Sequence, residues 1–258
     1  MNPFGKDVGV GVGRREAIQA LGSVVAVGFL SDCGEGGDTS SPTSASSAAS
    51  TGSATSAAST NAQCVVTPAE TEGPYFVDER LNRSDIRSDP SSGVVKAGVV
   101  LDLTMMLSQV SATGGCTPLA GALVDMWHCD ALGVYSDISQ QASVGQEFLR
   151  GYQISDATGK VRFTTIYPGW YSGRAVHIHF KARTNPDGAN GLEFTSQMFF
   201  DESLTDAVHA QAPYNSKGRR NTTLATDGIY RGGGTSLLVP LSGSGGGYAG
   251  TFYVGVRV

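Results

Sequence analysis

The chain has 258 residues, a formal net charge of −5 at pH 7, and 40% hydrophobic and 16% charged residues. A mildly acidic chain without a basic cluster lacks the positive surface that nucleic acids require, so we exclude that class of partner. The length accommodates one large or two small domains, but a low-complexity stretch leaves about 195 residues for folding, enough for one domain with a sizeable core.

Residues 1–33 match the pattern of an export signal peptide. An arginine pair, Arg14 and Arg15, precedes an apolar run at 17–30. That run is too short to span a bilayer but has the length of a signal-peptide h-region. The arginine pair favours twin-arginine export, with an ordinary secretory signal as the alternative. We therefore expect an exported protein.

The end of the signal region decides whether the exported chain is anchored. Residues 30–33, Leu-Ser-Asp-Cys, are similar to a lipobox, in which Cys33 would be acylated and would become a lipid anchor. Asp32 departs from the small residue usual before that cysteine, so acylation and its absence both stay open. Residues 34–63 are mostly Gly, Ser, Thr and Ala, which predicts a flexible linker. The expected location is extracellular, periplasmic or, with the anchor, the cell surface.

Residues 64–258 are expected to form one domain made mostly of strands. Alternating or β-branched runs predict strands at 94–107, 119–128, 160–166, 174–182, 194–200 and 248–258. One short helix is expected from Asp201 to about Gln211. Several strands, glycine-rich turns and almost no helix predict an all-β fold, either an antiparallel β-sandwich or a partly closed barrel.

Three cysteines lie in the predicted domain. In an oxidising compartment two of them can pair. Cys64 and Cys116 each open a turn-like segment followed by a proline, so we favour a disulfide between them and a buried thiol at Cys129. Spacing alone does not fix this connectivity.

The strand predicted at 174–182 carries a His-X-His pair, His177 and His179. Alternate side chains of a strand point to the same face, so both imidazoles point the same way and can chelate one metal ion. Such a pair can also decorate a solvated sheet face. Tyr171 and Arg174, which shortly precede the pair, favour a functional site.

The remaining ligands of such a metal are open on the residues alone. Cupins carry a glutamate shortly after the pair, but Arg183 and Thr184 stand there. A zinc site remains open through His128 and Cys129. Tyrosine is the other alternative, because a phenolate is a hard anionic donor that favours ferric iron, and bound metal lets a tyrosine ionise near neutral pH. Tyr167 and Tyr171 both qualify.

Four separated segments resemble the intradiol ring-cleavage dioxygenases, most closely the protocatechuate 3,4-dioxygenase-like branch. They are residues 71–76, 125–136, 167–180 and 195–200, and the resemblance spans nearly all of 64–258. It implies a ferric iron held by four side chains, namely Tyr135, Tyr171, His177 and His179. It further implies that Arg174 and Gln197 face the substrate ring and that Tyr75 lines the pocket entrance.

The resemblance also implies an activity. A family member would insert both atoms of O2 into a catechol, cleaving the ring between the two hydroxyl-bearing carbons to give a cis,cis-muconate-type product, with no organic cofactor. Only Ser172 and Gly173 separate Tyr171 from Arg174, which predicts a wider substrate mouth than in the protocatechuate enzymes. Protocatechuate, catechol and hydroxyquinol all remain open as substrates, and so does the oligomeric state, with a homodimer as one option.

Two other functions stay open at this stage. One is a secreted β-sandwich module that binds metal or carbohydrate without turnover, and the other is a zinc hydrolase. Colour discriminates them, because tyrosinate-to-iron charge transfer makes a ferric protein burgundy red while the alternatives are colourless.

Overall fold

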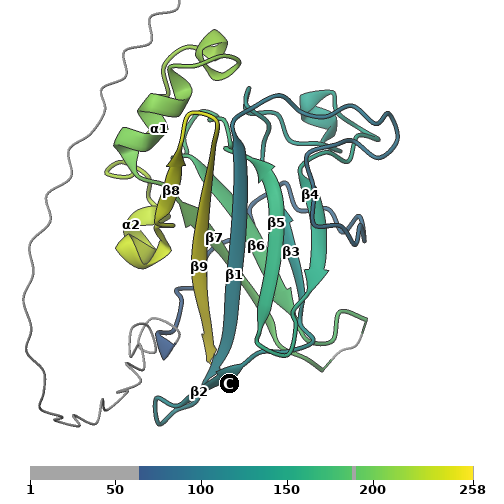
Figure 1. Ribbon diagram of the computed structural model, residues 1–258, viewed down its shortest axis with the longest axis vertical. Helices are drawn as coiled ribbons and strands as arrows, with labels where there is room; N and C mark the ends of the chain where they lie inside the picture. The colour runs from purple at the N-terminus through teal and green to yellow at the C-terminus, as the bar shows by residue number, and fades with distance from the viewer. Residues whose placement is uncertain (1–63, 188–189, 258) are drawn as a thin grey trace, which may run out of the picture. The chain divides into compact units, whose positions relative to one another are not determined.

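Two β-sheets packed face to face form the part of the chain that the computed structural model describes, residues 64–187 and 190–257 (Figure 1). This arrangement is the sandwich alternative of the predicted all-β fold. The predicted signal peptide and linker, residues 1–63, lie outside the described residues. Within the described ranges, none of the helices has the length and apolar character needed to cross a membrane.

The first sheet has five strands in the order β2-β1-β9-β8, with β5 also paired to β1. Its strands are β1 (Val100–Val110), β2 (Cys116–Pro118), β5 (Lys160–Ile166), β8 (Leu241–Ser244) and β9 (Gly247–Arg257). β1 and β9 pair in parallel, which corrects the purely antiparallel prediction. A parallel pair needs a long crossover, and here the whole second sheet lies between these two strands in the chain.

The second sheet has the order β4-β3-β6-β7, with every neighbouring pair antiparallel. Its strands are β3 (Leu123–Trp127), β4 (Arg150–Ile154), β6 (His177–Arg183) and β7 (Glu193–Phe199). The sequence prediction missed β2, β4 and β8. These strands are short, and β4 and β8 contain glycine with few β-branched residues, so their pairing rather than their propensity makes them strands.

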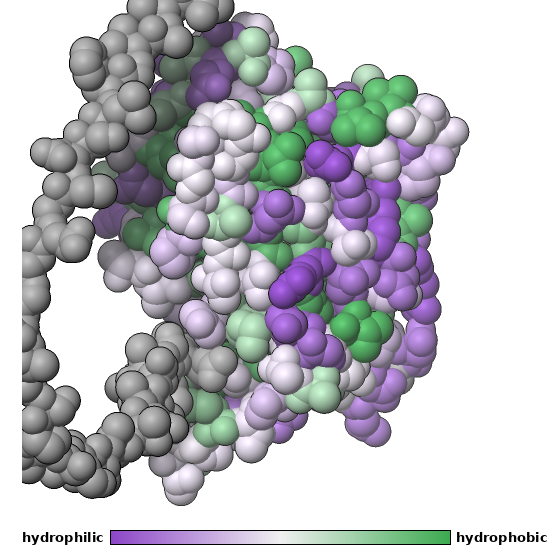
Figure 2. All heavy atoms as spheres, in the orientation of Figure 1, coloured by the Kyte–Doolittle hydropathy of each residue, from purple (hydrophilic) through white to green (hydrophobic). Residues whose placement is uncertain are grey.

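The core lies between the two sheets. Apolar residues of β1 and β5, such as Leu103 and Phe163, meet Ile178 and Phe180 of β6 in one buried cluster. The outer face of the five-stranded sheet is toward the viewer in Figures 1 and 2, and Figure 2 shows it as a mixture of hydrophilic and weakly polar residues with scattered hydrophobic ones. The second sheet is different, because every residue of β6 is buried.

Two α-helices follow the second sheet, where the sequence predicted one. Helix α1 (Glu202–His209) is the predicted helix, and the Asp201 side chain caps it by accepting hydrogen bonds from the backbone N–H groups of Ser203 and Leu204. Helix α2 (Tyr230–Gly233) is a single turn with glycines, which carries no periodic signal. Short 3-10 helices span Ser139–Gln141, Tyr214–Lys217 and Gly234–Leu237.

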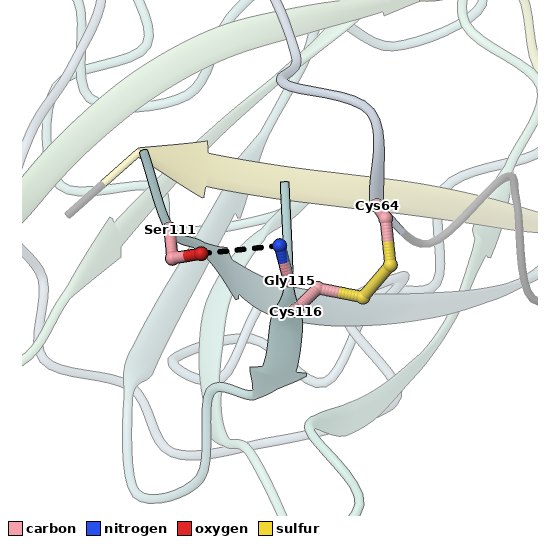
Figure 3. The surroundings of a disulfide bond; sticks show 4 residues. All are labelled: Cys64, Ser111, Gly115 and Cys116. Carbon is pink, nitrogen blue, oxygen red and sulfur yellow. Dashed lines mark hydrogen bonds between the residues drawn. A yellow bond between two sulfur atoms is a disulfide. The ribbon is translucent and has the colours of Figure 1, made fainter. Parts of the chain in front are cut away.

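A disulfide joins Cys64, at the start of the described chain, to Cys116 in β2 (Figure 3). The Cα atoms are 5.4 Å apart, although 52 residues separate the two cysteines along the chain. Cys129 is a buried free thiol. The predicted pairing is therefore confirmed.

Candidate active site

His177 and His179 lie on the outer face of β6, opposite the core side chains Ile178 and Phe180. Their Nε2 atoms are 3.0 Å apart, and the two residues are 2% and 1% exposed. Trp127 of β3 is the register partner of His179 and stacks on its ring, with centroids 5.0 Å apart and planes 9° from parallel. The sheet thus brings the two imidazoles together and fixes one of them by stacking.

Both imidazoles are in the form that binds metals. The Nδ1 atom of His177 is 2.6 Å from the carbonyl oxygen of Ala175, which can only accept, so Nδ1 carries the proton and Nε2 presents a lone pair. Burial, with the nearby Arg174 cation, lowers the pKa of His177 to about 3. Burial and then the neighbouring His177 hold the pKa of His179 well below its ordinary value. Neutral imidazoles are the metal-ligating form.

Tyr135 and Tyr171 reach the histidine pair from the loops that follow β3 and β5. Tyr171 Oη lies 3.1 Å from His177 Nε2, and the two tyrosine rings are edge to face with centroids 5.7 Å apart. The hydroxyl of Tyr135 is buried and has no hydrogen-bond partner among the residues described. Burial raises the pKa of Tyr135 well above its ordinary value and that of Tyr171 to about 12. Unless a metal ion binds them, both phenols are therefore neutral at physiological pH.

These four side chains fit a ferric ion. A buried phenol without a partner is costly, and a bound metal would satisfy it. Two phenolates and two imidazoles form a hard, partly anionic donor set that suits trivalent iron. Over residues 64–187 and 190–257, no group of three or more His, Cys, Asp or Glu residues is placed to hold a metal ion. A complete ligand set at this place therefore requires the tyrosines.

The other ligands considered from the sequence lie elsewhere. Both ring nitrogens of His128 are engaged, Nδ1 with the Cys129 carbonyl at 2.8 Å and Nε2 with the Thr165 hydroxyl at 2.7 Å. Burial raises the pKa of the Cys129 thiol to about 12, so it is not a thiolate. The Tyr167 hydroxyl is hydrogen-bonded to Thr205 at 2.7 Å. This geometry gives no support to a zinc site and leaves Tyr171, rather than Tyr167, beside the histidines.

Arg174 lies at the edge of the cluster. Its Nη1 is 3.5 Å from His177 Nε2, and its Nη2 donates to Gln197 Oε1 at 2.6 Å. The Gln197 amide nitrogen donates in turn to the Thr71 carbonyl at 2.8 Å. Gln197 is fully buried, and it links Arg174 to the loop that contains Thr71. Arg174 is thus a fixed cation next to the proposed ligands.

The segment 71–80, which we call the mouth loop, covers the cluster. Tyr75 packs its ring against Tyr135 with centroids 4.6 Å apart. The loop is fastened to β6 by ion pairs, because Lys181 pairs with Glu72 and Arg183 pairs with Asp78 at 2.9 Å. Tyr75 therefore lies against the tyrosine side of the cluster.

Two residues at this site were missed as functional candidates. Asp227 accepts hydrogen bonds from Arg174 Nε at 2.9 Å and from the backbone N–H of Ala175 at 2.7 Å. Burial would raise the pKa of Asp227, but backbone hydrogen bonds and Arg174 lower it below its ordinary value. Trp127 was not among the predicted site residues. No local sequence pattern marks Asp227, which lies in an irregular segment. The Trp127 stack depends on the register between β3 and β6, which the sequence does not specify.

Known proteins resemble this chain over much of its length. A family model described as Dioxygenase matches residues 71–212, more than half of the chain. The chain is 32% identical over 175 residues to a chlorocatechol 1,2-dioxygenase of Pseudomonas putida, covering 60% of each protein. It is 31% identical over 144 residues to the protocatechuate 3,4-dioxygenase beta chain of Burkholderia cepacia, covering 51% of this chain and 54% of that protein. The matches therefore span little more than half of these relatives.

Solved structures resemble the fold more completely. An intradiol ring-cleavage dioxygenase from Tetranychus urticae superposes with a TM-score of 0.65 at 29% identity, covering 75% of this chain and 95% of that one. The dioxygenase domain of a carbohydrate-binding fusion protein from Streptomyces sp. SirexAA-E gives a TM-score of 0.53 at 28% identity, covering 75% and 99%.

Proposed function

The chain belongs to the intradiol ring-cleavage dioxygenase family, and from that premise we propose that it uses O2 to cleave a catechol between its two hydroxyl-bearing carbons. The product is of the cis,cis-muconate type and contains both oxygen atoms. The observation that carries the proposal is the convergence of Tyr171, His177 and His179 with the unpartnered hydroxyl of Tyr135. These four side chains are the proposed ligands of ferric iron.

When bound, ferric iron supplies a Lewis acid that activates the catechol for reaction with dioxygen. The chain's own residues prepare this place. His177 and His179 present neutral nitrogen donors, and the two phenols, once ionised, neutralise two of the three positive charges of the ion. The Trp127 indole stacks on one face of the His179 imidazole, where it excludes water and keeps the imidazole parallel to the indole.

Tyr171 is the residue placed to take up a substrate proton. Burial gives its free phenol a pKa of about 12. A Tyr171 phenolate that is not bound to metal is therefore a strong base, and it can accept a proton from a catechol hydroxyl brought within hydrogen-bond distance. Tyr135 is more deeply buried than Tyr171, and its ring packs against Tyr75. We therefore propose that Tyr135 would hold the metal and would not take up the proton.

Arg174 stabilises negative charge on the bound catechol. Its guanidinium cannot lose its proton under physiological conditions, and it lies 3.5 Å from the His177 nitrogen, beside the proposed metal. A fixed cation aimed at the place where charge develops lowers the barrier without reorganisation during the reaction. Gln197 supports this role by accepting a hydrogen bond from Arg174 Nη2.

The proposed substrate class is a small catechol. Relatives bear the names of enzymes for catechol, chlorocatechol and protocatechuate, and these are the compounds to test first. We further propose that the domain acts outside the cytoplasm, with Cys33 as the acylation site if the chain is anchored. The arginine pair with its apolar run supports export, and the Cys64–Cys116 disulfide is typical of oxidising compartments.

The test combines colour with oxygen uptake. Iron-loaded protein is expected to absorb visible light through tyrosinate-to-iron charge transfer and to consume one O2 per catechol cleaved, across a panel of catechol, chlorocatechol, protocatechuate and hydroxyquinol. Tyr171→Phe should shift the absorption and slow turnover by about 100-fold or more. Tyr167→Phe is the matched control, because Tyr167 is a buried tyrosine bonded to Thr205 outside the cluster, and it should keep the colour. Colourless iron-loaded protein without oxygen uptake would favour a binding module.

A further inference from the structure

Asp227 connects helix α2 to the candidate active site through one carboxylate. Oδ1 accepts the backbone N–H groups of Ile229 and Tyr230, at 2.8 and 3.0 Å, at the start of the helix. Oδ2 accepts from Arg174 Nε and Ala175 N at 2.9 and 2.7 Å. We propose that Asp227 is a positioning residue for the proposed reaction, orienting the Arg174 guanidinium and the turn before His177.

The first consequence concerns Arg174. A guanidinium is planar, so a bond that fixes Nε also fixes the directions of both Nη groups. With Nε held by Asp227, Nη2 reaches Gln197 and Nη1 points to His177. The carboxylate is entirely buried, whereas the arginine side chain is 16% exposed, so the charge partner is rigid and the arginine is the group that meets substrate.

The second consequence concerns His177. The Ala175 peptide donates its N–H to Asp227 Oδ2, and the Ala175 carbonyl accepts the proton on His177 Nδ1. Holding this residue therefore also holds the acceptor that sets the tautomer and the orientation of the imidazole. Partners of this kind, one bond away from a ligand, commonly change metal affinity or activity when they are removed.

Asp201 shows what a simple helix cap looks like in the same chain. Its Oδ1 accepts from the backbone N–H groups of Ser203 and Leu204 at 2.9 and 3.0 Å, the same two-and-three-residue pattern that Asp227 Oδ1 makes at α2. Asp201 is exposed and bonds only within its own helix start. The difference between the two aspartates is the second oxygen of Asp227, which is occupied by Arg174 and Ala175.

The experiment compares Asp227→Asn with Asp201→Asn in the iron-loaded full chain. Asp227→Asn is expected to lower kcat/KM for catechol by about 10- to 100-fold and to weaken iron binding, measured by competition with a chelator, by about 10-fold. Asp201→Asn should leave both within about twofold of wild type. The double variant Arg174→Gln/Asp227→Asn should lose less kcat/KM than the product of the two single losses, because part of the Asp227 effect passes through that arginine.

The proposal is overturned if Asp227→Asn matches Asp201→Asn in iron affinity and in kcat/KM, or if its effect on kcat/KM is fully additive with Arg174→Gln. Should Asp227→Asn fail to fold, Asp227→Ser serves instead, because a serine hydroxyl can still accept from the backbone N–H groups of Ile229 and Tyr230 but supplies no second oxygen for Arg174 and Ala175. The proposal rests on the proposed function, yet the two can fail separately. Absence of oxygen uptake by the wild type sinks the function, while the iron-affinity comparison still decides the role of Asp227.

Discussion

β1 and β6 are central strands of the two sheets, and polar and apolar residues alternate over 101–105 of β1 and over the whole of β6. In β1 the environment alternates too, since Leu101 and Leu103 are buried while Asp102 between them is exposed. In β6 every residue is buried, including four polar ones, His177, His179, Lys181 and Arg183. The same sequence pattern thus accompanies a solvated face in one sheet and a covered face in the other.

The covered face shows how a sheet can present chemistry. Burying a polar side chain costs free energy unless it finds a partner. At one end of β6, Lys181 and Arg183 find carboxylates, Arg183 pairing with Asp125 at 2.7 Å. At the other end, the polar partners of His177 and His179 among the described residues are each other, the Tyr171 hydroxyl, a backbone carbonyl and Arg174. The first end fastens the mouth loop, and the second carries two of the proposed metal ligands.

The largest expected effect is on the histidine end of β6. His177→Ala removes one proposed ligand and the partner of Tyr171 Oη, so iron content after loading should fall by more than about tenfold. Metal analysis of the purified variant measures this directly. Thr104→Ala on β1 is the control, because Thr104 lies on the outer face of the other sheet. Equal iron content in the two variants would mean that His177 on the outer face of β6 contributes no more to iron binding than Thr104 on the outer face of β1.

The next effect is on the ion-paired end. Arg183→Ala leaves Asp125 buried without its cation, which should lower the free energy of unfolding by about 3–5 kcal/mol. Arg162→Ala on the exposed side of β5 should change it by less than about 0.5 kcal/mol. Denaturant titration of the apo-proteins measures both values. If Arg183→Ala lowers the free energy of unfolding as little as Arg162→Ala does, β6 does not depend on its buried ion pairs for stability.

Periodicity predicted the part of the site that lies on one strand. The shared face of His177 and His179 follows from strand alternation alone. Tyr135 and Tyr171 come from loops after β3 and β5, where no period links them to β6. Closeness along the chain to His177 made Tyr171 a candidate beside Tyr167, and only the family resemblance pointed to Tyr135 and chose Tyr171. Asp227 is 50 residues beyond His177 in an irregular segment (227 − 177), and neither route indicated it.

For the fold as well, features that depend on local sequence were predicted, and features that depend on contacts between distant segments were not. Long strands with β-branched residues were found, and the Cys64–Cys116 pair was inferred from its turn-like context and is confirmed. The parallel pairing of β1 with β9 was not found, because it depends on where the chain returns after building a whole sheet. Burial of the β6 outer face was not predicted either, since loops cover it.

The smallest expected effect separates a structural histidine from the proposed ligands. His128 has protein partners on both nitrogens, and burial lowers its pKa to about 4. In the unfolded chain its pKa is about 6.5. Between these values the unfolded state binds more protons than the folded state, so this histidine makes stability fall as pH drops from about 6.5 to 4.

His128→Gln removes this linkage while keeping a polar side chain in the core. Over the same pH window, the slope of the free energy of unfolding against pH should be smaller than in the wild type by up to about 1.4 kcal/mol per pH unit. Denaturant titrations at stepped pH measure it. Iron content should stay at the wild-type level, in contrast to His177→Ala. An unchanged slope of the unfolding free energy against pH, together with lost iron, would make His128 part of the metal centre. The hydrogen-bond partners of a buried histidine would then not distinguish a structural residue from a metal ligand.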